Sequence, residues 1–95
     1  MVFAPLDPVL HNQLRLAIVS LLVSVDAADF TFLLEKTGAT RGNLSVQITK
    51  LKEAGYIAVK KSFKDNYPNT MCFLSPKGLK AFETYVNAIK GYLGK

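Results

Sequence analysis

The sequence predicts a mostly α-helical domain that carries one small antiparallel β-hairpin. Apolar residues recur at helical spacings of three and four along much of the chain, and two short β-favouring runs interrupt this pattern after Gly55. The chain has 95 residues, 49% of them hydrophobic, which is enough for one modest core but not for two. We therefore expect residues 1–95 to form a single domain.

The first helix is expected to start at Asp7-Pro8, because a capping acid followed by proline is typical of a helix start. A broad apolar face then repeats at helical spacing. Its residues are Val9, Leu10, Leu14, Ala17, Ile18, Leu21 and Leu22.

A second, shorter helix follows a break at residues 25–29. Phe30, Leu33 and Leu34 form its apolar side, one or two strand residues are expected to precede it, and Gly38 is placed to end it.

The third helix is expected to start after a capping hydroxyl at Thr40. Leu44, Ile48 and Leu51 then repeat at helical spacing toward Gly55, which ends the helix.

A hairpin and a last helix complete the chain. Strands are expected at residues 56–63 and 70–75, with residues 64–69 as a projecting turn because they are rich in turn formers. Ser75-Pro76 repeats the cap-plus-proline signal and starts a helix over about 76–93. A heptad-like seam runs along that helix through Leu79, Phe82, Val86, Ile89 and Leu93.

The order helix-helix-helix-strand-strand-helix describes a helix-turn-helix followed by a hairpin wing. The distribution of charge indicates that the helix-turn-helix and the hairpin have a binding role. Residues 36–64 contain seven Lys and Arg but only one acid, Glu53, and the whole chain has a net charge of +5. Such an excess is typical of a surface that binds nucleic acid or an anionic membrane, and a merely solvated lysine-rich surface is the alternative.

The sequence disfavours several other classes of protein. One cysteine and one histidine provide neither a disulfide framework nor a zinc site, and we expect Cys72 to be a buried hydrophobe rather than a redox sensor. No catalytic triad, carboxylate pair or phosphate-binding glycine loop is present, so we expect no enzyme activity and no cofactor or metal. The apolar stretch at residues 14–25 is too short and too polar to span a membrane, and no signal peptide is evident. We therefore expect a reduced, cytoplasmic protein without membrane contact.

Three segments resemble the winged helix-turn-helix regulators of the MarR and ArsR superfamily, in particular its small single-domain members. Residues 10–18 look like the opening pattern of the family's first helix. Residues 40–57 are similar to its recognition helix, with a capping hydroxyl, an aliphatic-Ser pair and a glycine leading into the wing. Residues 74–78, Leu-Ser-Pro-Lys-Gly, look like the junction that opens its last helix.

The chain also departs from the family's pattern. Gln13 stands where a proline is usual, and Asp65 falls on the acid of the wing motif, but Tyr67 and Thr70 occupy the two positions where arginines are usual. The resemblance implies DNA binding and dimerisation through the terminal helices.

The DNA-binding residues are expected on the third helix and on the wing. At about 100° per residue, the helix buries Leu44, Ile48 and Leu51, and the residues that point broadly away from this face are Gly42, Ser45, Val46, Thr49, Lys50 and Glu53. Arg41 is suited to guanine, Asn43 to adenine and Val46 to a thymine methyl, whereas Lys50 and Lys52 are suited to phosphates. The full predicted set is Thr40, Arg41, Gly42, Asn43, Ser45, Val46, Thr49, Lys50, Lys52, Lys60, Lys61, Lys64, Asn66 and Tyr67. An ordinary solvated helix face and lysines that protect an edge strand are the alternatives.

A dimer interface is expected on the last helix, which carries more apolar surface than a small monomer needs. The first helix and the leader, including Val2 and Phe3, are expected to complete it. The predicted interface residues are Leu6, Val9, Leu10, Leu79, Phe82, Tyr85, Val86, Ile89, Tyr92 and Leu93. The alternative is that both helices only cover their own core.

These observations predict a homodimeric, sequence-specific regulator of transcription that binds double-stranded DNA and most simply represses by occupying an operator. A winged helix that serves as a protein–protein interaction module, without sequence-specific DNA binding, is the alternative. Binding to anionic lipid is a remote third reading, because a basic amphipathic helix is absent. The residues do not identify a small-molecule effector.

Overall fold

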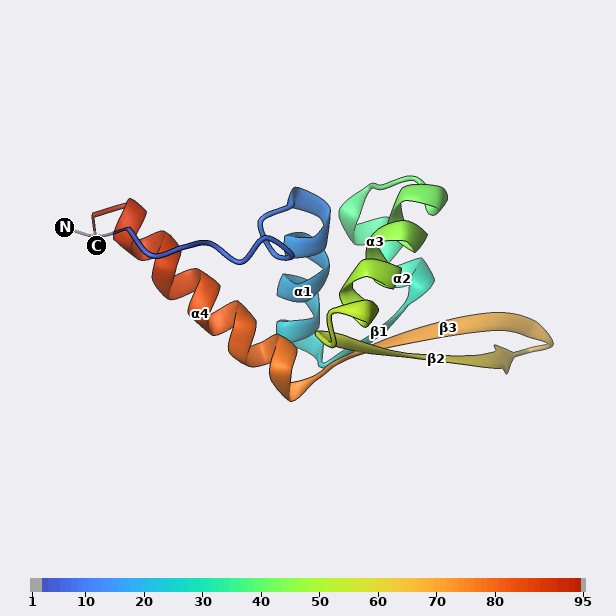
Figure 1. Ribbon diagram of the computed structural model, residues 1–95. Coiled ribbons are helices and arrows are strands. Elements are labelled where there is room, and N and C mark those ends of the chain that lie inside the picture. The colour runs from blue at the N-terminus through green and yellow to red at the C-terminus, as the bar shows by residue number, and fades with distance from the viewer. Residues whose placement is uncertain (1–2, 95) are drawn as a thin grey trace.

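The computed structural model describes residues 3–94, which form four helices and a three-stranded sheet (Figure 1). In chain order the elements are α1 (Gln13–Val25), β1 (Ala27–Asp29), α2 (Phe30–Thr37), α3 (Arg41–Glu53), β2 (Ile57–Lys64), β3 (Tyr67–Leu74) and α4 (Pro76–Tyr92). The predicted fold class is confirmed. Val2, which was expected to help form a dimer interface, lies outside the described residues, as do Met1 and Lys95.

The sheet is antiparallel throughout, in the order β1-β3-β2. The strand residues expected before α2 form β1, which pairs with β3 so that Ala28 lies opposite Cys72. Because β1 joins the hairpin to the start of α2, the wing is fixed to the helix-turn-helix rather than hinged on α3 alone.

The predicted start of the first helix was wrong. Asp7 does accept hydrogen bonds from backbone amides, at 2.8 Å from Val9 and 3.3 Å from Leu10, but it caps only a short turn. The chain is then extended at Asn12, whose side chain accepts from the amide of Arg15 at 2.9 Å, and α1 starts at Gln13. The capping acid and the proline therefore do start a turn, as their sequence indicates, but this turn is too tight to continue as a helix.

The predicted limits of α2 and α3 are confirmed. Asp29 caps α2 by accepting from the amide of Phe32, and Gly38 ends it with a φ of 68°, which glycine adopts without steric strain. Thr40 caps α3 by accepting from the amide of Asn43 at 3.2 Å. Only three residues, Gly38, Ala39 and Thr40, therefore separate the two helices.

The hairpin is longer and its turn tighter than predicted. Asp65 and Asn66 alone form the turn, both with positive φ, as in the two-residue loops that suit twisted hairpins. Residues 67–69, which were expected in the turn, pair with β2 instead. A two-residue loop closes on a hydrogen-bonded pair, so the next pair, Phe63 with Pro68, is a non-hydrogen-bonded one, and the proline needs no amide hydrogen there.

A single core lies between the helices and the sheet. Its fully buried members include Ile18, Leu22, Leu33, Leu44 and Leu51. Cys72 is also fully buried, as the sequence predicted, and burial raises the pKa of its thiol to about 11.

The last helix starts close to β2 and then extends away from the domain (Figure 1). Gly78 permits the close start, because a Cβ at this position would lie 2.1 Å from the carbonyl oxygen of Tyr56. The leader runs beside α4, where Tyr92 Oη donates to the carbonyl of Ala4 at 2.9 Å and the Tyr92 ring lies 4.8 Å from that of Phe3. Because α4 and the hairpin project in opposite directions, the molecule is elongated, 56 × 25 × 21 Å (Figure 1).

Two of the predicted interface residues lie in the protomer's own core. Leu10 is fully buried, and Tyr85 is buried with its hydroxyl 2.9 Å from His11 Nδ1. The helix is rotated relative to the predicted seam, so that Tyr85 and Ala88 face inward and Leu79 faces solvent. Leu10 and Tyr85 are therefore not available to contact a partner.

Candidate nucleic-acid interface

The exposed side of α3 brings together the residues that the sequence predicted for base and phosphate contacts. Leu44, Ile48 and Leu51 are buried as expected, and this fixes which way the rest of the helix points. The predicted residues on this helix and its cap are all exposed: Thr40, Arg41, Gly42, Asn43, Ser45, Val46, Thr49, Lys50 and Lys52. Val46 is the only large apolar side chain in this group, with half of its surface exposed.

One flank of α3 faces the wing and forms a groove with it. Ser45, Thr49 and Lys52 line the groove from the helix, and Lys61 and Thr70 line it from the hairpin. Thr49 Oγ1 donates to the carbonyl of Ser45 at 3.0 Å, so its oxygen lone pairs are left to accept from a ligand. Helix and wing thus form one continuous concave surface with cations at both rims.

Arg41 is the first residue of α3. Its guanidinium lies 5.9 Å from the centroid of the Phe30 ring, which is a cation–π distance and holds the side chain at the amino end of the helix. This end also carries the positive pole of the helix dipole, so Arg41 reinforces a potential that favours an anion.

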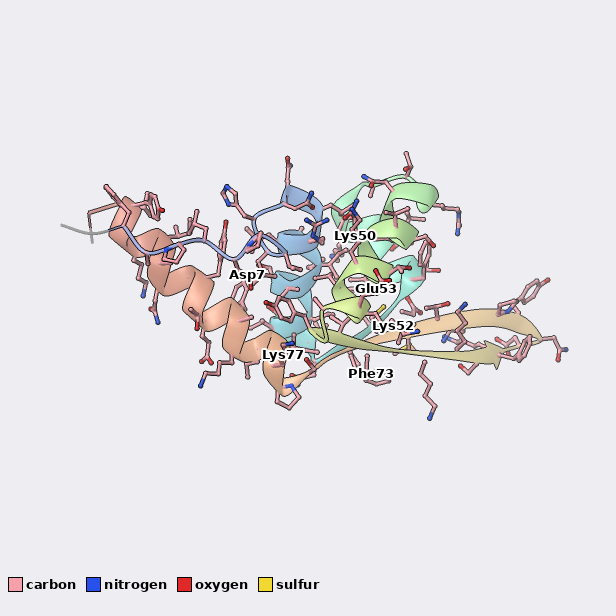
Figure 2. The ribbon with its side chains drawn as sticks, in the orientation of Figure 1. Asp7, Lys50, Lys52, Glu53, Phe73 and Lys77 are labelled. Carbon is pink, nitrogen blue, oxygen red and sulfur yellow. The ribbon has the colours of Figure 1, made fainter. Side chains whose placement is uncertain are left out.

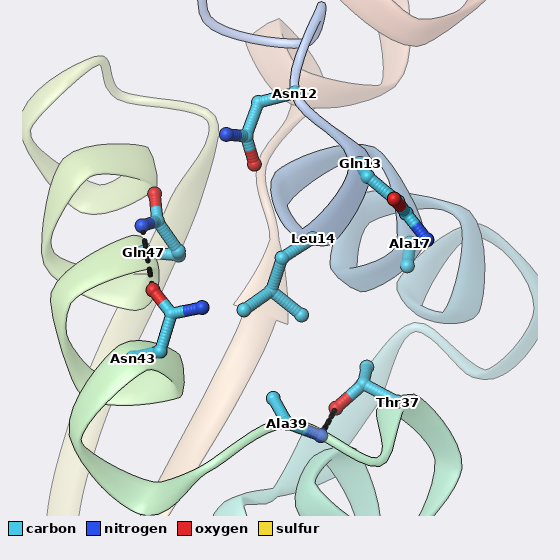
Figure 3. A pocket seen from close by; sticks show the side chains of 8 residues that line it. All are labelled: Asn12, Gln13, Leu14, Ala17, Thr37, Ala39, Asn43 and Gln47. Carbon is cyan, nitrogen blue, oxygen red and sulfur yellow. Dashed lines mark hydrogen bonds between the residues drawn. The ribbon is translucent and has the colours of Figure 1, made fainter.

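The opposite flank of α3 is held by a hydrogen-bond chain that sequence reasoning missed. Arg15 Nε donates to the carbonyl of Val9 at 2.6 Å, and its Nη1 donates to Gln47 Oε1 at 2.5 Å. Gln47 Nε2 in turn donates to Asn43 Oδ1 at 3.0 Å, as Figure 3 shows. The chain crosses from α1 to the exposed end of α3 beside a pocket between these helices and the end of α2.

This chain has a consequence for base recognition. The hydrogen bond from Gln47 uses one of the two lone pairs of Asn43 Oδ1 and holds the orientation of this amide, whose NH2 group remains free to donate. The bidentate contact with adenine that the sequence suggested needs both the oxygen and the NH2 group. In the arrangement seen here, Asn43 is instead suited to donating to an acceptor such as guanine O6 or thymine O4.

The wing residues are divided between the two faces of the hairpin. Lys61 shares its face with Val59 and the groove, because alternate residues of a strand point the same way. Lys60, Lys64 and Tyr67 lie on the other face, and Asn66 is in the turn. The structure therefore brings only Lys61 of the predicted wing lysines to the groove beside α3.

Sequence reasoning also missed the exposed side chain of Phe63. It follows Lys61 on the same face, near the tip, and 77% of its surface is exposed. The alternation of side chains between the two faces of the strand was the signal that would have revealed Phe63.

Cations dominate the α3 side, and a separate polar cluster lies near α4. Figure 2 shows Lys50, Lys52 and Glu53 on α3, with Asp7 and Lys77 on the side of the domain that adjoins α4. The single acid Glu53 is in the last turn, far from the amino end of the helix.

That second cluster joins the leader to the domain. Tyr56 Oη donates to a carboxylate oxygen of Asp7, and the Lys77 ammonium lies 5.8 Å from the centroid of the Tyr56 ring. Burial, followed by the hydrogen bond to Asp7 and the negative charge of that residue, raises the pKa of Tyr56 to about 12. The tyrosine is therefore a protonated donor at any physiological pH.

None of the helices within residues 3–94 has the length and apolar character needed to cross a bilayer. Over the same range, His, Cys, Asp and Glu side chains do not gather in threes as metal ligands would.

Comparisons with known proteins agree with this geometry. A family model described as a winged helix DNA-binding domain matches residues 14–93. An uncharacterized protein of Methanocaldococcus jannaschii is 32% identical over 81 residues, which cover 85% of this chain and 88% of the relative.

Solved structures show the same fold. A transcriptional regulator homologue from Pyrococcus horikoshii superposes with a TM-score of 0.84 at 24% identity, covering 90% of this chain and 85% of that one. NadR in complex with 4-hydroxyphenylacetate gives 0.73 at 22% identity over 92% of this chain and 64% of NadR. YusO from Bacillus subtilis gives 0.77 at 16% identity over 94% and 59% of the two chains.

Proposed function

Because the chain belongs to the winged helix DNA-binding domain family, we propose that it is a sequence-specific transcriptional regulator that binds operator DNA as a homodimer and represses by occupancy. Membership confirms the resemblance inferred from the sequence, and it places the chain among DNA-binding domains rather than enzymes. The observation that carries the proposal is the exposed, cation-rimmed surface formed by α3 and the wing. Such a regulator works where the DNA is, which we take to be the cytoplasm.

In this proposal α3 enters the major groove with its amino end toward the base edges. Arg41 reads a guanine through two hydrogen bonds, Asn43 donates to a base acceptor, and Val46 contacts a thymine methyl. Lys50 and Lys52, farther along the helix, neutralise phosphates and set the register. The small side chains Gly42 and Ser45 let the helix backbone approach the groove floor.

The dimer in this proposal forms through the C-terminal helix, over about residues 76–93, and the leader bound beside it. Leu93 is 65% exposed and Tyr92 45%, both at the end of α4 that extends beyond the domain. Leu79 is exposed and Phe82, Val86, Ile89, Leu6 and Val9 are partly buried, so a second copy has an apolar strip to cover. A twofold axis there sets the two α3 helices one DNA turn apart, about 34 Å, for binding to an inverted repeat.

The first experiment is selection of bound sequences from a random duplex pool at two salt concentrations. We expect an inverted repeat with half-sites about one helical turn apart, and a steep loss of affinity as salt rises. Weak binding without an enriched motif overturns the proposal and favours the protein–protein interaction module, whose basic face would meet an acidic partner.

Arg41→Ala tests the central contact of this model. We expect the selected motif to lose its preference at one position in each half-site, at a cost of about 1 to 3 kcal/mol, because a bidentate guanine contact is removed. Lys36→Ala is the matched control, since Lys36 is another cation set over a ring, 5.8 Å from that of Phe32, but lies on α2. An unchanged motif in Arg41→Ala would remove this residue from base recognition.

A further inference from the structure

The tip of the wing carries an apolar pair that the protein's own core does not use. Phe63 and Pro68 lie directly opposite each other on the two strands, and one further pair, Lys64 with Tyr67, separates them from the turn. Both are exposed. In a non-hydrogen-bonded antiparallel pair the two side chains lie close together, so ring and pyrrolidine form one compact apolar surface. In residues 3–94 the hydrophobic core and the side chains packed against it do not include either of them.

The charges around this pair are those of a surface that meets a polyanion. Lys61 is the next residue inward on the same face of the strand as Phe63, and Lys60 and Lys64 lie on the opposite face. The one acid at the tip, Asp65, has a φ of 52°, a conformation that Asp and Asn tolerate better than most residues, so the turn itself explains its presence.

The pair is also continuous with the recognition surface. From the tip inward, the same face carries Phe63 with Pro68, then Lys61 with Thr70. Lys61 and Thr70 line the groove shared with Ser45, Thr49 and Lys52 of α3. Figure 1 shows the hairpin projecting well beyond the helices, so a duplex lying against α3 extends over this face of the wing.

Resting on the function proposed above, we propose that Phe63 and Pro68 form a wedge that enters the minor groove beside the major groove occupied by α3. Apolar wedges of Phe or Pro at a base step are a known way to unstack and kink a duplex. The wing lysines then pair with the phosphates on either side of that groove. The wedge deforms the DNA, so it adds a preference for flexible pyrimidine–purine steps at positions that α3 does not touch.

The test uses the full chain and the operator recovered by selection, with 2-aminopurine placed at the steps flanking each half-site. Wild-type protein is expected to raise 2-aminopurine fluorescence at one step, because unstacking relieves quenching. Phe63→Ala is expected to abolish that rise and to weaken binding by about tenfold or more, the scale of a lost stacking contact. Its salt dependence should not change, since no charge is removed.

Two further variants give the controls. Phe63→Leu keeps an apolar wedge and should restore most of the affinity. Phe73→Ala removes a phenylalanine that is 37% exposed on the opposite face of the sheet, opposite Ala27 and Ala58, and should behave as wild type. Because Phe63 is exposed, its replacement leaves the fold intact, which circular dichroism checks.

The possible outcomes distinguish failure of the wedge from failure of the proposed function. If wild type binds its selected operator but Phe63→Ala binds and unstacks equally well, the wedge is overturned and the proposed function stands. If no operator is selected at all, the proposed function fails and the wedge fails with it. If Phe63→Ala instead loses binding to vesicles of anionic lipid while binding to DNA is unchanged, the wing tip is a membrane contact and the wedge is wrong.

Discussion

Helices α3 and α4 start in the same way, but the side chains that they expose to solvent differ in polarity. Both α3 and α4 start after a hydroxyl cap, Thr40 and Ser75, which accepts from the amide three residues on. On α3 the exposed side is made of small polar and cationic residues, with Val46 as the one large apolar side chain. On α4 the exposed side includes Leu79, Tyr92 and Leu93.

The difference in polarity agrees with the two roles proposed for these helices. A helix that enters a DNA groove needs short side chains for close approach, hydrogen-bonding groups for base edges and cations for phosphates. A helix that pairs with its own copy needs area to remove from water. In the proposed function, the domain therefore divides DNA binding and dimerisation between α3 and α4.

The largest expected effect tests the α4 side of this comparison. Val86 is half-buried, and the side chains packed against the core in the described part of the chain do not include it, so Val86→Glu places a charge directly in the proposed dimer seam. We expect the dimer dissociation constant to rise at least about 100-fold, because an unpaired charge would have to be desolvated. Operator affinity should fall with it, since two half-sites are no longer bound together.

Sedimentation velocity measures the oligomeric state, and Asn87→Glu serves as the matched control, because Asn87 is the exposed next residue on the same helix. A Val86→Glu protein that sediments as a dimer would move the interface away from α4.

A smaller effect tests the polar side. Gln47→Leu removes the donor that occupies Asn43 Oδ1 and also the acceptor for Arg15, while keeping the side chain's bulk. Free to rotate, Asn43 can make the bidentate adenine contact, so the selected base at one position should shift toward adenine, at a cost in stability of about 1 kcal/mol.

The double variant Gln47→Leu with Asn43→Ala supplies the control. If Gln47 acts through Asn43, the double variant should have the same motif as Asn43→Ala alone. A further change in the double variant would show that Gln47 contacts the DNA itself.

What the sequence could predict follows from the range of the interactions. Thr40, Gly38 and the face formed by Leu44 and Ile48 depend on neighbours within one or two turns, and all were predicted correctly. The hydrogen bond from Arg15 to Gln47 spans 32 positions, and no local spacing points to it. The same limit explains Asp7, whose carboxylate is bound by Tyr56, 49 positions away, as well as by the amides of its own turn.

Two other errors have geometric causes. The residues Tyr67-Pro68-Asn69 have turn-forming composition, but the left-handed pair at Asp65 and Asn66 completes the reversal before them. On α4, the predicted seam and the adjoining strip differ by a small rotation of the helix, and the sequence does not contain the angle at which the helix meets the core. Tyr85 was assigned to an interface for that reason, and Leu10 because the first helix was expected to start at Asp7 rather than after the turn that buries this residue.

The smallest expected effect concerns the contact that connects the two sides, where Tyr56 donates to Asp7 next to α4. The raised pKa, about 12 against an ordinary 10, means that the folded protein keeps this proton while the unfolded chain loses it. That contribution to stability is complete below pH 10 and is lost as pH rises toward 12. Tyr56→Phe should therefore show a shallower fall in melting temperature between pH 10 and 12 than wild type, with operator binding at neutral pH unchanged because the cluster lies away from α3. Tyr67→Phe, at the exposed wing tip, is the control, and if its fall is as shallow as that of Tyr56→Phe, the hydrogen bond to Asp7 does not link leader and domain energetically.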